Sequence, residues 1–167
     1  MIPASVARDI ARASKSGKIT AKRIKQLEAK SDHDTAALVE ALAEKCQKTS
    51  RPWIHYGLTS NDLVDTSNSM QMRDAIKIIQ PKVSKLSLLL SKNAVKYKNV
   101  PAVGRTHGQH ASIISFGLKC ANWAAEMSTH LERLDEIKKR VLISNHQGVV
   151  GTGTLTGQQA IKVQERV

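Results

Sequence analysis

The chain has 167 residues, enough for one domain with a hydrophobic core or for a small domain and part of another. Its 26 Lys and Arg against 14 Asp and Glu give a formal net charge of +12, which suits nucleic acid, an anionic membrane surface or a polyanionic small substrate. Aromatic residues make up only 3% of the chain and no nucleic-acid-binding motif occurs, so the composition argues against nucleic acid and favours a solvated basic surface.

The sequence also indicates the cellular compartment. Cys46 and Cys120 lie far apart on apolar helix faces, which is typical of reduced, buried thiols. No apolar stretch of a signal peptide follows Met1, and the longest apolar run is far shorter than the roughly 20 residues of a membrane span. We therefore expect a cytoplasmic protein without a membrane partner.

The hydrophobic pattern is helical nearly throughout. Short helices are predicted over residues 5–14, 20–30 and 33–47, the second capped by Thr20. His33 opens the third helix, where an imidazole is a poor cap but is well placed to reach a pocket.

An irregular segment over residues 49–58 follows these helices. Trp53 and Tyr56 flank His55 there, and this clustering fits either the wall of a pocket or a packed loop.

Two long helices dominate the rest of the chain. The first covers residues 61–98, and Pro81 should either kink it or start a new helix. The second carries an apolar stripe over 113–141 with near-heptad spacing, typical of a helix in a bundle. A Gly/Thr-rich loop over 148–157 precedes a last helix, which begins near Gln158 and continues to the chain end without a C-cap, as expected of a truncated chain.

These elements predict an all-α fold. We expect a helical N-terminal domain over residues 1–98 and the beginning of a long-helix bundle over residues 99–167. Outside a complete bundle, the apolar seam of residues 113–141 should be exposed and should lead to self-association or to binding of a partner.

Residues 105–111 (RTHGQHA) form the most chemically informative cluster. His107 brings an imidazole, the side-chain type that can give or take a proton near neutral pH, and Arg105 and Gln109 suit a carboxylate-bearing substrate. His107 and His110 are three residues apart, but no carboxylate or thiol stands at a companion spacing, so we expect no metal. The glycine loop matches no nucleotide-binding fingerprint, and no cofactor is expected.

A second polar cluster opens the first long helix. Thr59 and Ser60 lie where the helix begins, with Asp62 in its first turn. They fit either an N-cap, which spacing alone favours, or a site where hydroxyls and free N–H groups bind an anion.

Four regions resemble the adenylosuccinate lyases of the fumarase/aspartase superfamily. Residues 55–66 (HYGLTSNDLVDT) resemble their first signature region, and residues 104–111 (GRTHGQHA) with 116–119 (FGLK) resemble the second. Residues 31–34 (SDHD) resemble a helix-opening His-Asp, and residues 148–152 (GVVGT) a glycine loop. Because all four occur in order over almost the whole chain, the resemblance implies a fumarase/aspartase-like fold.

Two features separate the related families. Argininosuccinate lyases have Ser-Arg-Asn-Asp where residues 59–62 read Thr-Ser-Asn-Asp, and carboxymuconate cycloisomerases usually have Trp at the position of His107. The resemblance therefore favours adenylosuccinate lyases.

The resemblance implies a C–N lyase of purine biosynthesis that eliminates fumarate from adenylosuccinate and from the succinyl-aminoimidazole carboxamide ribotide. A base removes a proton beside a carboxylate, and His107 as general acid protonates the departing nitrogen. His33 is the second catalytic candidate, supporting binding or proton transfer. The implied substrate-binding residues are Thr59, Ser60, Asn61, Gln109, Thr106, His55 and Arg105. The implied partners are a purine nucleotide substrate and, in the full-length protein, three further copies in a homotetramer whose active sites each draw on three subunits.

Two parts of the family pattern do not occur in these 167 residues. One is the Gly-Ser-Ser-x-Met-Pro-x-Lys-x-Asn loop, whose serine is thought to act as the base; the other is the opening helix with its Arg-Tyr substrate contact. We therefore expect this chain, truncated at both ends relative to the family, to be inactive alone. The alternatives are another superfamily lyase, or a non-enzymatic basic helical module that binds an acidic protein or RNA.

Overall fold

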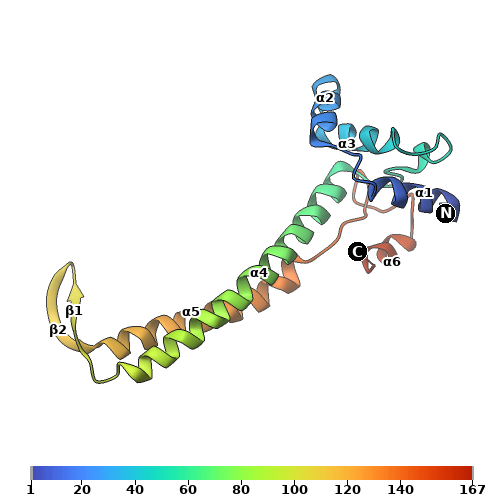
Figure 1. The fold of residues 1–167 in the computed structure, drawn as a ribbon. Helices are drawn as coiled ribbons and strands as arrows, with labels where there is room; N and C mark the ends of the chain where they lie inside the picture. The colour runs from blue at the N-terminus through green and yellow to red at the C-terminus, as the bar shows by residue number, and fades with distance from the viewer. Residues whose placement is uncertain (1, 167) are drawn as a thin grey trace. The chain divides into compact units, whose positions relative to one another are not determined.

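The structure is a computed structural model that describes residues 2–166. The helices are α1 (Ala4–Ser14), α2 (Ala21–Ser31), α3 (Asp34–Ala43), the 3-10 turn η1 (Arg51–Trp53), α4 (Ser60–Lys96), α5 (Phe116–Val141) and α6 (Gln159–Gln164), and the strands are β1 (Pro101–Thr106) and β2 (Gln109–Ser115) (Figure 1). The predicted all-α fold is confirmed, with one small hairpin added.

The chain forms two compact units. Unit 1 contains the residues up to Ser67 together with those from Ser144 onward, and unit 2 contains Asn68–Ile143. The long helix α4 contributes its first turns to unit 1 and the remainder to unit 2.

Unit 1 is built on α2 and α3. Leu27, Ala37 and Ala41 are buried together as its core. The hydroxyl of Thr20 accepts a hydrogen bond from Arg23 N at 3.2 Å, which confirms the predicted cap of α2. His33 is the N-cap residue of α3, and its Nδ1 accepts a hydrogen bond from Ala36 N at 3.4 Å, a long bond that agrees with the prediction of a poor cap.

Helix α3 ends at Ala43, four residues before the predicted end. The buried Asp9 carboxylate of α1 accepts a hydrogen bond from Gln47 N at 2.9 Å. This contact redirects the chain beyond α3, and the sequence pattern of α3 alone does not contain it.

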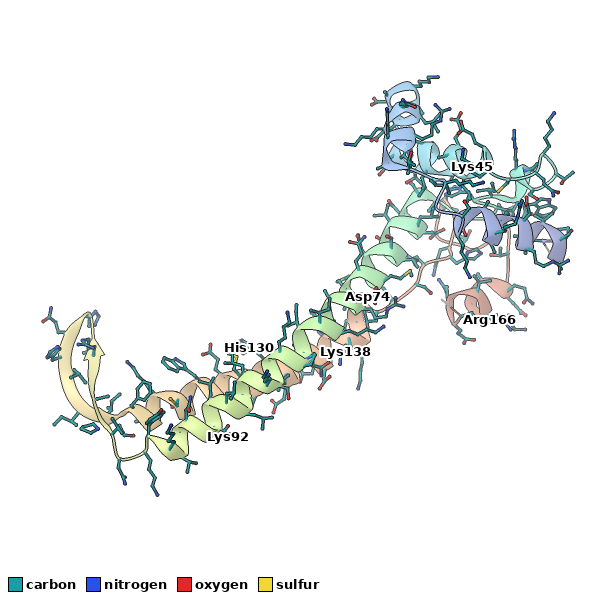
Figure 2. The ribbon with its side chains drawn as sticks, in the orientation of Figure 1. Lys45, Asp74, Lys92, His130, Lys138 and Arg166 are labelled. Atoms are coloured by element: carbon teal, nitrogen blue, oxygen red, sulfur yellow. The ribbon has the colours of Figure 1, made fainter. Side chains whose placement is uncertain are left out.

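Unit 2 consists mainly of the antiparallel pair formed by α4 and α5 (Figure 1). The side-chain amide of Gln80 on α4 donates to the Asp135 carboxylate on α5 at 2.9 Å. Lys138 Nζ, on the α5 residue labelled in Figure 2, donates to the side-chain amide oxygen of Gln80 at 2.6 Å. Helix α4 continues through Pro81, so the alternative that this proline begins a new helix was wrong.

The apolar stripe of α5 faces α4 only in part. Cys120 and Ala124 are buried, whereas Ile137 is 45% exposed. Ile113, the expected first member of the stripe, lies in strand β2 and is 85% exposed, because α5 begins only at Phe116 with Ser115 as its cap. The expectation that the whole seam is exposed was therefore wrong where α4 covers it.

Within the described residues, no helix is long and apolar enough to cross a membrane.

Candidate active site

A cavity of about 440 Å³ in unit 1 brings four predicted site residues together. His33 comes from the start of α3, His55 from the turn after η1, and Thr59 and Ser60 from the start of α4. Asn61, also predicted, is exposed and does not line the cavity.

The ring of His33 is oriented by its capping bond. Nδ1 lies 3.4 Å from Ala36 N and 3.4 Å from the Asp34 carboxylate. When Nδ1 accepts the hydrogen bond from Ala36 N, the neutral ring carries its proton on Nε2. That nitrogen is then a donor, which suits a carboxylate ligand better than it suits proton abstraction.

His55 combines backbone strain with an unsatisfied ring nitrogen. Its φ is +63°, in the left-handed region that few residues other than glycine adopt. Its Nε2 is buried without a hydrogen-bond partner among the described residues. Such strain and such orphaned polar atoms cost free energy and cluster at functional sites, and a polar ligand in the cavity would provide the missing partner.

The neighbouring aromatic residues do not line the cavity. The rings of Trp53 and Tyr56 pack against each other with centroids 5.3 Å apart. Of the two predictions for this segment, the packed loop is therefore right for the two aromatic residues, and the pocket wall is right for His55.

The start of α4 serves as both helix cap and cavity wall. Thr59 N donates to the carboxylate of Asp62 at 3.0 Å, half of a capping box. The N–H groups of the first turn of a helix have no intrahelical acceptor, and the helix dipole favours an anion beside them. The two predictions for this cluster are thus compatible.

Asp62 is a buried residue whose contacts with the glycine loop were not predicted from the sequence. Its carboxylate is only 3% exposed and also accepts hydrogen bonds from Gln147 N at 3.1 Å and Gly148 N at 2.8 Å. Burial pushes the pKa of Asp62 upward, but these backbone donors outweigh that effect and the pKa lies below its usual value. The capping-box spacing in the sequence indicates the hydrogen bond between Asp62 and Thr59 N. No pattern in the sequence indicates the hydrogen bonds between Asp62 and the glycine loop.

Sequence reasoning also missed six cavity-lining residues: Thr35, Ala36, Val39, Glu40, Leu58 and Val149. Glu40 lies two helical turns after His33 on the same face of α3, a spacing visible in the sequence. Val149 belongs to the glycine loop, and no local pattern connects it with α3 or α4.

The second cluster lies on the hairpin of unit 2. Thr106 pairs with Gln109, so His107 and Gly108 form a two-residue turn with φ of +51° and +74°, as in a type I′ turn. Arg105 Nη2 lies 3.3 Å from His110 Nε2. The predicted residues Arg105, Thr106, His107 and Gln109 are all exposed.

The predicted site thus falls into two groups of residues, one in each compact unit. Within the described residues, no three His, Cys, Asp or Glu side chains are grouped so that they could hold a metal ion.

Comparison with known proteins gives the family. The sequence profile of a family described as Lyase matches residues 2–167. The adenylosuccinate lyase of Methanocaldococcus jannaschii is 41% identical over 167 residues, which are 100% of this chain and 36% of the relative. The N-acetyl-S-(2-succino)cysteine lyase of Enterococcus italicus is 36% identical over 99% of this chain and 36% of the relative.

A solved structure agrees with this result. The 3-carboxy-cis,cis-muconate lactonizing enzyme of Pseudomonas putida matches with a TM-score of 0.90 and 30% identity, over 99% of this chain and 38% of that chain. The chain belongs to the lyase family of the fumarase/aspartase superfamily, which confirms the family predicted from its motifs. It spans about 36% of the length of the first curated relatives that it matches.

Proposed function

We propose that this chain provides part of the active site of a C–N lyase that eliminates fumarate from adenylosuccinate and from the succinyl-aminoimidazole carboxamide ribotide in purine biosynthesis. The observation that carries the proposal is the cavity in unit 1, where two imidazoles and two hydroxyls meet at a helix start. Adenylosuccinate lyases among the curated relatives, at 41% and 40% identity, support this substrate.

The cavity residues suit the substrate's succinyl group. Thr59 and Ser60 offer hydroxyls beside free helix N–H groups, which bind a carboxylate and stabilise the dianion that forms when the neighbouring C–H bond is broken. His33 offers an Nε2–H donor, and His55 a buried nitrogen in need of a partner.

Elimination then needs a proton for the leaving nitrogen. As the C–N bond breaks and the C=C bond forms, His107 donates its proton to that nitrogen, while Arg105, Thr106 and Gln109 contact the substrate. The exposed turn that carries His107 fits insertion into a pocket.

The base and the other subunits are not provided by these 167 residues. The family's serine-bearing loop motif does not occur in them, so we expect the chain alone to bind ligand without turning it over. A cytoplasmic homotetramer with shared active sites belongs to the same proposal.

The test is an NMR titration of the 167-residue chain with fumarate and then with AMP. We expect saturable shifts of the Ser60 and Asn61 amides. Ser60→Ala should weaken fumarate binding by tenfold or more, because a hydrogen bond to a charged group is worth about 1.5–3 kcal/mol. Ser14→Ala is the matched control, since that exposed hydroxyl donates to Ala11 O within α1 and does not line the cavity.

Two results would contradict parts of the proposal. Unchanged Ser60 and Asn61 amides at millimolar fumarate would remove the carboxylate site. A saturable AMP site that is insensitive to His107→Ala would place His107 outside the pocket.

A second substrate is supported by the relative from Enterococcus italicus, which is named for a succinylated cysteine. Adenylosuccinate and that compound share the succinyl group that the cavity residues would bind. Binding of N-acetyl-S-(2-succino)cysteine without binding of AMP would favour this second substrate.

A non-enzymatic role is supported by the charge distribution. Residues 75–125 contain eight Lys or Arg residues and no Asp or Glu. Lys92 is one of these cations and is exposed on α4 (Figure 2). Salt-dependent binding of heparin or RNA that is unaffected by His107→Ala and weakened by Lys92→Ala would favour an acidic partner over a nucleotide.

A further inference from the structure

We infer that Asp62 is a positioning residue for the proposed carboxylate site: its buried carboxylate holds the glycine loop against the start of α4, so that Val149, although largely exposed, borders the cavity beside Thr59 and Ser60. The inference rests on the proposed function and adds a residue that none of the proposed substrate contacts includes.

The hydrogen bonds of Asp62 connect two segments that are distant in sequence. One carboxylate oxygen accepts from Thr59 N at 3.0 Å and from Gly148 N at 2.8 Å, and the other accepts from Gln147 N at 3.1 Å. All three donors are backbone groups, so the carboxylate fixes the path of the chain rather than the rotamer of a side chain.

A second set of contacts extends the attachment along α4. Asn145 N donates to the Thr66 hydroxyl at 2.9 Å, and Asn145 Nδ2 donates to the exposed Asp65 carboxylate at 3.0 Å. The chain therefore follows the first two turns of α4 before it reaches Gly148.

The loop approaches the turn after η1 closely. A Cβ atom at Gly148 would lie 3.3 Å from Gly57 O, and the φ of Gly148 is +74°. Val149 follows directly and lines the cavity that Thr59 and Ser60 also line. A shift of residues 147–149 thus changes the cavity wall.

Asp62 also determines which N–H groups are left for a ligand. Because its carboxylate accepts the Thr59 N–H, that donor is occupied, and a ligand would use the first-turn N–H groups that follow it in α4, which have no intrahelical acceptor. An amide in place of the carboxylate would turn an NH₂ group against at least one backbone N–H and would release part of this arrangement.

The experiment measures the fumarate Kd of the 167-residue chain and its Asp62→Asn variant by NMR, well below the melting temperature of each. We expect Asp62→Asn to bind about tenfold more weakly, a change that corresponds to ~1.4 kcal/mol. Asp65→Asn removes an equal charge one turn further along α4 and keeps an acceptor for Asn145, so its Kd should equal that of the wild type.

The Kd distinguishes positioning from stability. A merely structural role would lower the melting temperature of Asp62→Asn and leave the Kd of the folded chain unchanged. If Asp62→Asn does not fold, Gly148→Ala displaces the same loop without a change in charge, and it should weaken binding similarly.

The possible failures are separable. If the wild type binds and the Asp62 or Gly148 variant that folds binds equally well, the inference is overturned and the proposed function stands. If the wild type shows no saturable binding of fumarate, both are overturned.

Discussion

Gly117→Ala should change the stability of unit 2 through two opposing effects, higher helix propensity and a steric clash. Gly117 lies in the first turn of α5, where alanine is favoured over glycine by up to about 1 kcal/mol. A Cβ atom there would lie 2.5 Å from Ala94 O, 2.6 Å from Lys98 Cα and 2.7 Å from Lys98 N. These are backbone atoms of α4 and the turn after it, so no side-chain rotation relieves the clash.

The clash should win over helix propensity. Overpacking of this kind typically costs about 1–3 kcal/mol, and the displaced backbone also carries the Gly117 N to Tyr97 O hydrogen bond of 3.0 Å. We expect the variant to be less stable by about 1–2 kcal/mol, with a melting temperature lower by about 2–4 °C for each kcal/mol in a chain of this length.

Thermal unfolding followed by Trp123 fluorescence, in chains whose other tryptophan is replaced, reports on unit 2. Asn122→Ala, an exposed helix position on α5, is the control and should leave the melting temperature unchanged or slightly raised. A higher melting temperature for Gly117→Ala would show that helix propensity outweighs packing, and would refute the close approach of α5 to α4.

Three further predictions concern the site and the two units. His107→Asn should preserve the hairpin, because Asn tolerates positive φ in a type I′ turn, whereas His107→Val should destabilise the hairpin by about 1 kcal/mol. Cross-strand nuclear Overhauser effects distinguish the two variants, and an intact hairpin in the Val variant would contradict the turn assignment. Burial raises the pKa of Asp62, but its backbone hydrogen-bond donors lower it by more, so the pKa in the folded chain lies below its ordinary value. The ionised Asp62 therefore stabilises the fold above its usual pKa near 3.8, and this stabilisation is lost as the pH falls towards the folded pKa. In urea unfolding from about pH 5 to about pH 3, the free energy of unfolding should fall more steeply for the wild type than for Asp62→Asn. Equal slopes would contradict the depressed pKa of Asp62. Burial raises the pKa of the Cys46 thiol, so iodoacetamide should modify it slowly in the folded chain and quickly in urea; equal rates would mean that the thiol is accessible.

Much of this protein is determined by local sequence. The 3.6-residue period predicts α2, α4 and α5, and the Thr20 cap follows from its hydroxyl alone. The motif residues identified the family, which the comparisons confirmed. These predictions succeed because helix formation and capping depend on residues within a few positions of one another.

The hairpin and the cavity depend on the tertiary structure. Strands β1 and β2 are short, largely exposed and lack a clear apolar alternation, so only their pairing through the turn at His107 defines them. His33 lines the same cavity as Thr59 and Ser60 because of where α3 packs in unit 1. Val149 also lines this cavity, because Asp62 holds the glycine loop by hydrogen bonds. Hydrogen bonds between segments 85 residues apart leave no periodic signal in the sequence, since either partner alone is compatible with many neighbours.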